Sequence, residues 1–198
     1  MRKSPILLLV AIFAFCFMAG CDEDMRIGAE KVIESSHSGK PGWFLNKPES
    51  DKKYYYFIGE DTSLTSAGVR DAYQVALSRI SYYISTEVKA VYKQVANALD
   101  IETANQLKES FIQNVSQSAF SRAKEKEIYW EKIARNTLQG VEYYYRVYSL
   151  VRIPKESLEK SAEETMDTQI KKAQSEKNEK VYSELKKIES EMKNVFTE

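Results

Sequence analysis

The run from Val141 to Ile153 alternates strongly between two kinds of side chain, and this constrains the fold more than any composition figure. A period of two puts successive side chains on opposite faces of a β-strand. The stretch from Lys126 to Ile133 has the same period, and the short segment 136–140 lies between the two. We therefore expect an antiparallel hairpin. One face of its second strand would carry Val141, Tyr143, Tyr145, Val147, Val151 and Ile153.

The first strand of this hairpin is expected to have one wet face. Ile128 and Trp130 lie on one side, and Glu127, Tyr129 and Glu131 lie on the other. An antiparallel sheet often packs one face on a core and leaves the other in water. The carboxylates favour water on the side that carries Glu127, Tyr129 and Glu131.

Other segments predict a third strand and two helices. The aromatic stretch Tyr54 to Gly59 is typical of a strand. Apolar residues at steps of three and four predict one helix over 65–84, and a second over 101–121 that Asp100 would cap. Ala72 and Ala76 lie on the apolar stripe of the first helix, so we expect that helix to approach a sheet closely.

The segment from Thr86 to Val95 fits two structures. Val88, Ala90 and Tyr92 alternate with charged positions as in a strand, whereas Val88, Val91 and Tyr92 also fit one face of a helix. We favour the strand and leave the helix as the alternative.

Residues 155–198 predict a charged amphipathic helix after Pro154. Its apolar line either faces a partner, including a second copy of the chain, or packs back on the chain's own sheet or frays in solvent. The residues of the candidate partner face are Val181, Leu185, Ile188, Met192 and Val195.

Together these patterns predict an α+β fold: a small antiparallel sheet packed by one or two helices, with a long C-terminal charged amphipathic helix. The expected domain covers residues 41–155, and the helical extension covers 156–198. Residues 21–40 are largely polar and are expected to form a flexible tether.

The N-terminus predicts a bacterial lipoprotein. Arg2 and Lys3 precede an apolar run, and the residues from Met18 to Cys21 form a lipobox, so residues 1–20 would be a signal peptide. The apolar run is short for a membrane-spanning helix, which needs about 20 residues. We expect an acylated Cys21 that anchors the chain to the bilayer on the outer or the inner membrane of the cell envelope.

Composition argues against several classes of function. The chain has 29 basic and 29 acidic residues, and a nucleic-acid-binding protein would show a basic excess. The two cysteines lie in the leader and at the lipidation site, and His37 has no second histidine or free cysteine beside it. We therefore expect no enzyme activity, no cofactor and no bound metal.

A lipobox, a Pro-x-Trp motif, an aromatic strand that ends in glycine, an alanine-bearing helix and a late strand that runs into Ile-Pro-Lys follow one another along the chain. The residues that carry this order are Cys21, Pro41, Trp43, the strand 56–59, Ala67, Ala72, Ala76 and the segment 147–155. In this order of features the chain resembles the LPP-twenty lipoprotein family, although its long helical tail is less usual there. The resemblance implies a small α+β envelope domain without shared enzyme chemistry, among relatives that include surface antigens and flagellar basal-disk lipoproteins.

Two functions follow as hypotheses. The first is a non-enzymatic lipoprotein that scaffolds or recruits envelope proteins, in a flagellar or cell-wall assembly. The alternative is a binding module for an envelope glycan, peptide or lipid, because tyrosine combines an apolar ring with a polar tip. Its candidate binding surface is Tyr144, Tyr148 and Trp43.

Overall fold

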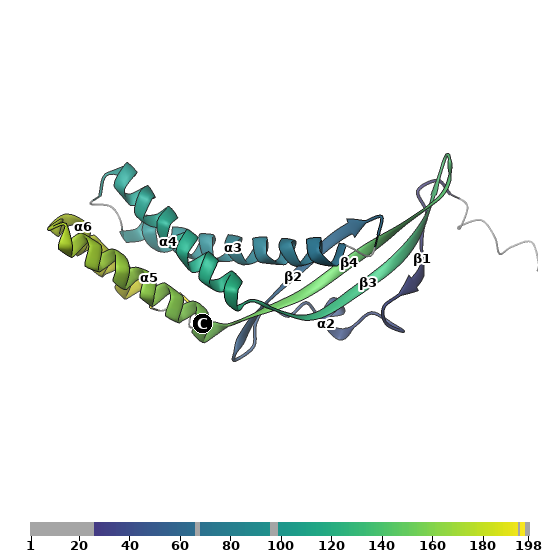
Figure 1. Cartoon of the computed structure of the whole chain (residues 1–198), viewed down its shortest axis with the longest axis horizontal. Coiled ribbons are helices and arrows are strands. Elements are labelled where there is room, and N and C mark those ends of the chain that lie inside the picture. The colour runs from purple at the N-terminus through teal and green to yellow at the C-terminus, as the bar shows by residue number, and fades with distance from the viewer. Residues whose placement is uncertain (1–25, 66–67, 96–98, 194, 197–198) are drawn as a thin grey trace, which may run out of the picture.

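The computed structural model describes residues 26–65, 68–95, 99–193 and 195–196 and has an α+β fold (Figure 1). The strands are β1 (Glu30–Ser35), β2 (Tyr54–Ser63), β3 (Lys124–Thr137) and β4 (Gly140–Pro154). The helices are α2 (Gly42–Leu45), α3 (Gly68–Val95), α4 (Ile101–Arg122), α5 (Lys155–Ser175) and α6 (Glu179–Met192). The molecule is elongated, with α4, α5 and α6 at one end and the tip of the sheet at the other.

The sheet is antiparallel, with strand order β1-β3-β4-β2. The predicted hairpin is confirmed: β3 and β4 pair from Lys124 opposite Arg152 to Thr137 opposite Gly140. The Thr137 hydroxyl closes the turn, since it accepts from the Gln139 amide at 3.2 Å and donates to the Gly140 carbonyl at 2.9 Å. The strand predicted at Tyr54 is also present and continues to Ser63.

Helix α3 approaches the sheet as closely as its alanines predicted. Ala72 and Ala76 are fully buried, and both pack over Gly59 of β2. A β-carbon at Gly59 would lie 1.8 Å from the Ala72 carbonyl oxygen and 2.5 Å from the Ala76 nitrogen. Only glycine fits between this helix and this strand.

The strand expected over residues 86–95 is wrong, because α3 continues without a break to Val95. Val88, Val91 and Tyr92 are buried on the helical spacing, and the Tyr92 ring lies 6.4 Å from that of Phe111. A helix is favoured over a strand here because α4 packs against these buried residues of α3. As predicted, the Asp100 side chain caps α4 and accepts from the Thr103 amide at 2.8 Å.

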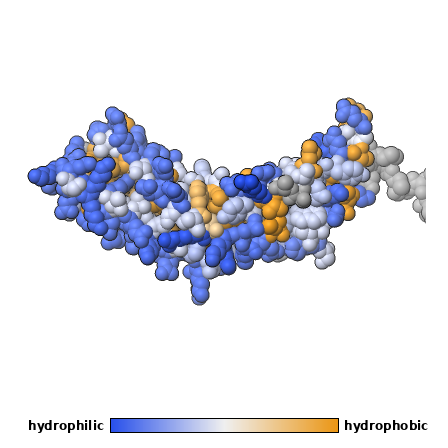
Figure 2. Space-filling model, in the orientation of Figure 1, coloured by the Kyte–Doolittle hydropathy of each residue, from blue (hydrophilic) through white to orange (hydrophobic). Residues whose placement is uncertain are grey.

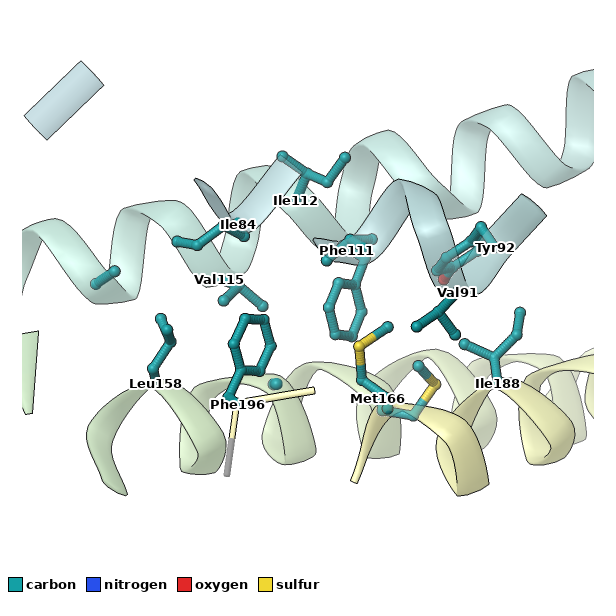
Figure 3. Close-up of a cluster of buried hydrophobic side chains, with 14 of the residues drawn as sticks. Ile84, Val91, Tyr92, Phe111, Ile112, Val115, Leu158, Met166, Ile188 and Phe196 are labelled. Carbon is teal, nitrogen blue, oxygen red and sulfur yellow. The ribbon is translucent and has the colours of Figure 1, made fainter. Parts of the chain in front are cut away.

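The C-terminal segment forms two helices and not the single helix that the sequence predicted. The chain turns at Lys177, whose φ is 55°, and the Asn178 side chain caps α6 by accepting from the Val181 amide at 3.2 Å. The α5–α6 hairpin packs against α3 and α4 around a shared core (Figure 3).

The predicted partner face of α6 is therefore turned inward. Val181, Leu185, Ile188 and Met192 are buried in the chain's own core, and Val195 packs against the same cluster. The prediction of a face free for another protein is wrong, and the alternative that the segment packs back is closer to the structure. The core beneath it belongs mainly to helices, however, and only partly to the sheet.

The flexible tether expected up to residue 40 is also wrong in part. Residues 30–35 form the edge strand β1, which pairs with β3 from Glu30 opposite Arg135 to Ser35 opposite Glu131. Most β1 side chains are exposed, so the pairing depends on backbone hydrogen bonds and gives little apolar signal. The acylation site and the lipobox lie outside the described residues.

We expect Gly59→Ala to lower the free energy of unfolding by about 3 kcal/mol, because the added methyl group would force α3 away from β2. Urea unfolding followed by circular dichroism measures this. Gly39→Ala is the matched control, since a β-carbon there meets no atom within 4 Å. Equal unfolding midpoints for the two variants would contradict the packing described.

We expect Leu185→Ala to destabilise the fold by about 3 kcal/mol, because its side chain is 0% exposed. Ser183→Ala changes an exposed position of the same helix and serves as the control. If the two variants unfold at the same urea concentration, α6 is not part of the cooperative core.

Candidate binding surface on the sheet

The sheet has two faces, and α3 covers the face that carries Gly59 and Val151. The opposite face, here the second face, carries Tyr129 of β3 and Tyr148 of β4, which lie directly across from each other. The short helix α2 reaches this face, because the Phe44 ring packs on both tyrosine rings. Two of the predicted binding residues, Tyr144 and Tyr148, therefore lie on the second face.

Three rings form an aromatic cluster, defined as Phe44, Tyr129 and Tyr148. Phe44 lies edge-on to Tyr148 at 4.8 Å and to Tyr129 at 5.4 Å, and the two tyrosines stack at 6.0 Å with an angle of 20°. Trp43 extends the cluster at its rim, 6.4 Å from Phe44. Aromatic pairs of this geometry stabilise a fold by more than the burial of their apolar area alone.

A carboxylate lies buried next to this cluster. Glu131 is 2% exposed, accepts a hydrogen bond from the Tyr129 hydroxyl at 2.8 Å, and lies 3.5 Å from the Lys40 ammonium. Burial, with the hydrogen bond to Glu131, raises the pKa of Tyr129 to about 12. The wet face predicted for Glu127, Tyr129 and Glu131 is therefore wrong for the last two residues.

A second polar group joins β1 to β4 on the same face. Arg146 donates to Glu30 at 3.0 Å and to the Tyr144 hydroxyl at 3.2 Å, and it lies 4.0 Å from Glu60. Hydrogen bonds from Tyr144 and then Arg146 lower the pKa of Glu30. Because β3 lies between these strands, the Arg146 side chain connects the edge strand to the centre of the sheet.

The three residues of the predicted binding surface lie around this one face, but they are not equally accessible. Tyr144 and Trp43 are half-buried, whereas Tyr148 is 8% exposed beneath Phe44. The prediction that Tyr148 is a surface residue is wrong. The ring that covers Tyr148 belongs to Phe44 of α2, a one-turn helix that precedes β2.

Sequence reasoning missed Phe44, Glu131 and Arg146 as members of this arrangement. The alternation in β3 already placed Glu131 on the side of Tyr129, but the charge of Glu131 argued for water on that side. Nothing in the local sequence showed that Lys40 would approach the carboxylate.

These polar groups mostly pair with one another. Glu131, Tyr129 and Lys40 satisfy each other, as do Glu30, Tyr144 and Arg146. His37 is exposed and makes a 2.9 Å hydrogen bond with the Ser36 hydroxyl. Within the described ranges, no three His, Cys, Asp or Glu side chains are placed to hold a metal ion. The arrangement holds α2 and β1 on the sheet.

Several hollows lie away from the aromatic cluster, on the helices and at the end of the sheet where β2 begins and β4 ends. One cavity of about 240 Å³ lies between α5, α6 and Phe196. Its lining includes the apolar side chains of Met166 and Met192 and the acidic side chains of Glu159 and Asp167. It shares no residue with the aromatic cluster.

Comparisons with known proteins give no neighbour. No family model, curated protein or solved structure matches the chain. The resemblance to the LPP-twenty family thus stays a prediction. In the part of the chain that the structure describes, no helix is both long enough and apolar enough to span a bilayer.

We expect the free energy of unfolding to fall between pH 10 and pH 12, because the pKa of Tyr129 is about 10 in the unfolded chain and about 12 in the folded one. Below pH 10 the tyrosine is neutral in both states and the stabilisation is complete. Tyr129→Phe removes this contribution, so its stability should decline less steeply over that interval. Urea unfolding at each pH measures the slope.

The exposed Tyr143→Phe variant is the control for the loss of a hydroxyl. A Tyr129→Phe slope equal to that of the wild type would contradict the burial of this hydroxyl against Glu131.

Proposed function

We propose that this chain is a non-enzymatic lipoprotein of the bacterial cell envelope, held at a membrane by acylated Cys21, and a structural, scaffold or adaptor component of an envelope assembly. The lipobox at 18–21 carries the proposal, because small residues before a cysteine and after an apolar run are the signal for lipid attachment. The LPP-twenty resemblance favours a flagellar or cell-wall setting.

The arrangement of the described residues supports a structural role over chemistry. The buried polar groups of the second face pair with each other, which favours a role for them in holding the strands together. The apolar faces of α5 and α6 are used inside the core, so a protein partner would bind the charged outer surface, which Figure 2 shows over the helical end.

The aromatic binding module has less support as the alternative. Its three residues do surround one face, which favours it, but Phe44 covers Tyr148 and leaves mainly Trp43 and Tyr144 to a ligand. A glycan or peptide would therefore meet a smaller aromatic surface than the sequence predicted.

Substitution of the lipidated cysteine tests the proposal. We expect wild-type protein to take up a labelled fatty acid and to stay with membranes, and Cys21→Ser to lose both properties. Cys16→Ser removes the other cysteine, within the expected leader, and should leave acylation unchanged. In-cell crosslinking then identifies envelope proteins captured by the wild type and not by Cys21→Ser.

Acylation that persists in Cys21→Ser would contradict the anchor. An anchored protein that crosslinks to no envelope protein would contradict the scaffold and move the aromatic alternative ahead.

A further inference from the structure

We infer that the tip of the sheet rests on the lipid bilayer, so that the β3–β4 turn and the start of β1 form a second membrane contact beside the acyl anchor. This inference rests on the proposed lipidation of Cys21. It concerns described residues at the end of the sheet that the second face and the helical core do not use.

Exposed apolar side chains gather at this end. Most of the large apolar side chains exposed among the described residues belong to it, and Figure 2 shows apolar residues at this end of the molecule. The members of this group, here the apolar tip, are Ile27, Val32, Ile33, Leu138, Val141 and Tyr143. Single exposed apolar residues are ordinary, but a group at one end of an elongated molecule indicates a contact with something apolar.

The turn itself is chemically unusual for a water-exposed hairpin. Two-residue turns between β-strands favour asparagine, aspartate and glycine. Here the first turn residue is Leu138, which is 85% exposed and follows Thr137 directly. No described core residue covers it, so its apolar side chain is unfavourable in water and favourable in lipid.

The backbone brings the N-terminal segment to the same place. The Gly28 amide donates to the Asn136 carbonyl at 2.7 Å, and the Asn136 amide donates to the Ala29 carbonyl at 3.0 Å. Ile27 therefore lies next to the end of β3. The start of the described chain and the β3–β4 turn form one end of the molecule, away from the helices (Figure 1).

The length of the intervening chain then limits the distance to the bilayer. Cys21 precedes Arg26 by five residues, and a fully extended chain spans at most about 3.6 Å per residue, or roughly 18 Å. An acylated Cys21 lies at the membrane surface, so Arg26 must remain within that distance of it. A lipid surface is thus the nearest apolar medium for the apolar tip.

The residues around the apolar tip suit the interface between head groups and acyl chains. Tyr143 is exposed and has an apolar ring with a polar hydroxyl, which is the pattern of residues that settle at this boundary. Arg26 and Arg135 are exposed nearby and can meet lipid phosphates. With the tip on the membrane, the α5–α6 hairpin would project away from it.

Spin-label depth measurements on the full-length, acylated protein test this orientation. The mature chain would carry no thiol other than Cys21, so Leu138→Cys gives one labelling site in an exposed turn. Glu176→Cys, exposed at the far end of α5, is the matched control. Both proteins are placed in phosphatidylethanolamine and phosphatidylglycerol vesicles, and the access of oxygen and of a water-soluble nickel chelate to each label is compared.

Lipid contact predicts a ratio of oxygen access to nickel access that is several-fold higher at residue 138 than at residue 176, because oxygen concentrates in acyl chains and the chelate stays in water. Equal ratios at the two sites would overturn the inference. Low access of both reagents at residue 138 would also overturn it, since this result indicates contact with protein, such as a second copy of the chain.

Vesicle flotation separates failure of this inference from failure of the proposed function. If wild-type protein floats with vesicles and Cys21→Ser does not, the anchor is established and the label at residue 138 decides the membrane contact. If wild-type protein does not float, the proposed lipoprotein function fails and the inference fails with it.

Discussion

The close contact between α3 and β2 is the interaction on which the rest of the structure depends. Gly59 lets the backbone of Ala72 and Ala76 lie directly on the sheet, and this fixes the direction of a helix about 42 Å long. The first turns of α3 pack on β2 and β4, and its later turns pack on α4 and α6. If α3 lay at another angle, the sheet and the helical core would separate, because both pack along this one helix.

The spacing of apolar residues predicted those helices and strands that bury one face and repeat their apolar residues at regular intervals. The β3–β4 hairpin, the first half of α3 and α4 with its Asp100 cap were all found this way. It failed where tertiary contacts decide between two patterns, as at Val88 and Tyr92, which satisfy both a strand and a helix until Phe111 is placed against them. It also failed for β1, whose exposed side chains resemble those of a linker while its backbone pairs with β3.

The second face illustrates a different limit of sequence reasoning. Tyr148, Tyr144 and Trp43 could be grouped from their residue types, and the structure does gather them around one face. What no pattern could show is that Phe44 covers Tyr148. Nor could a pattern show that a buried Glu131 is tolerated because the Tyr129 hydroxyl donates a hydrogen bond to it and the Lys40 ammonium pairs with its charge. Residues separated by about 90 positions in the chain share that carboxylate, so the signal is not local.

The pairing of the edge strands has a consequence for the order in which the chain acquires its structure. β1 pairs with residues made about 100 positions later, and β2 with residues made about 90 positions later, so neither can find its partner early in synthesis. The β3–β4 hairpin has local contacts and can form first, and β1 and β2 then pair with its two edges. Until then β1 and β2 lack their partner strands, and the sheet is completed only after the chain has been made as far as Pro154, the last residue of β4.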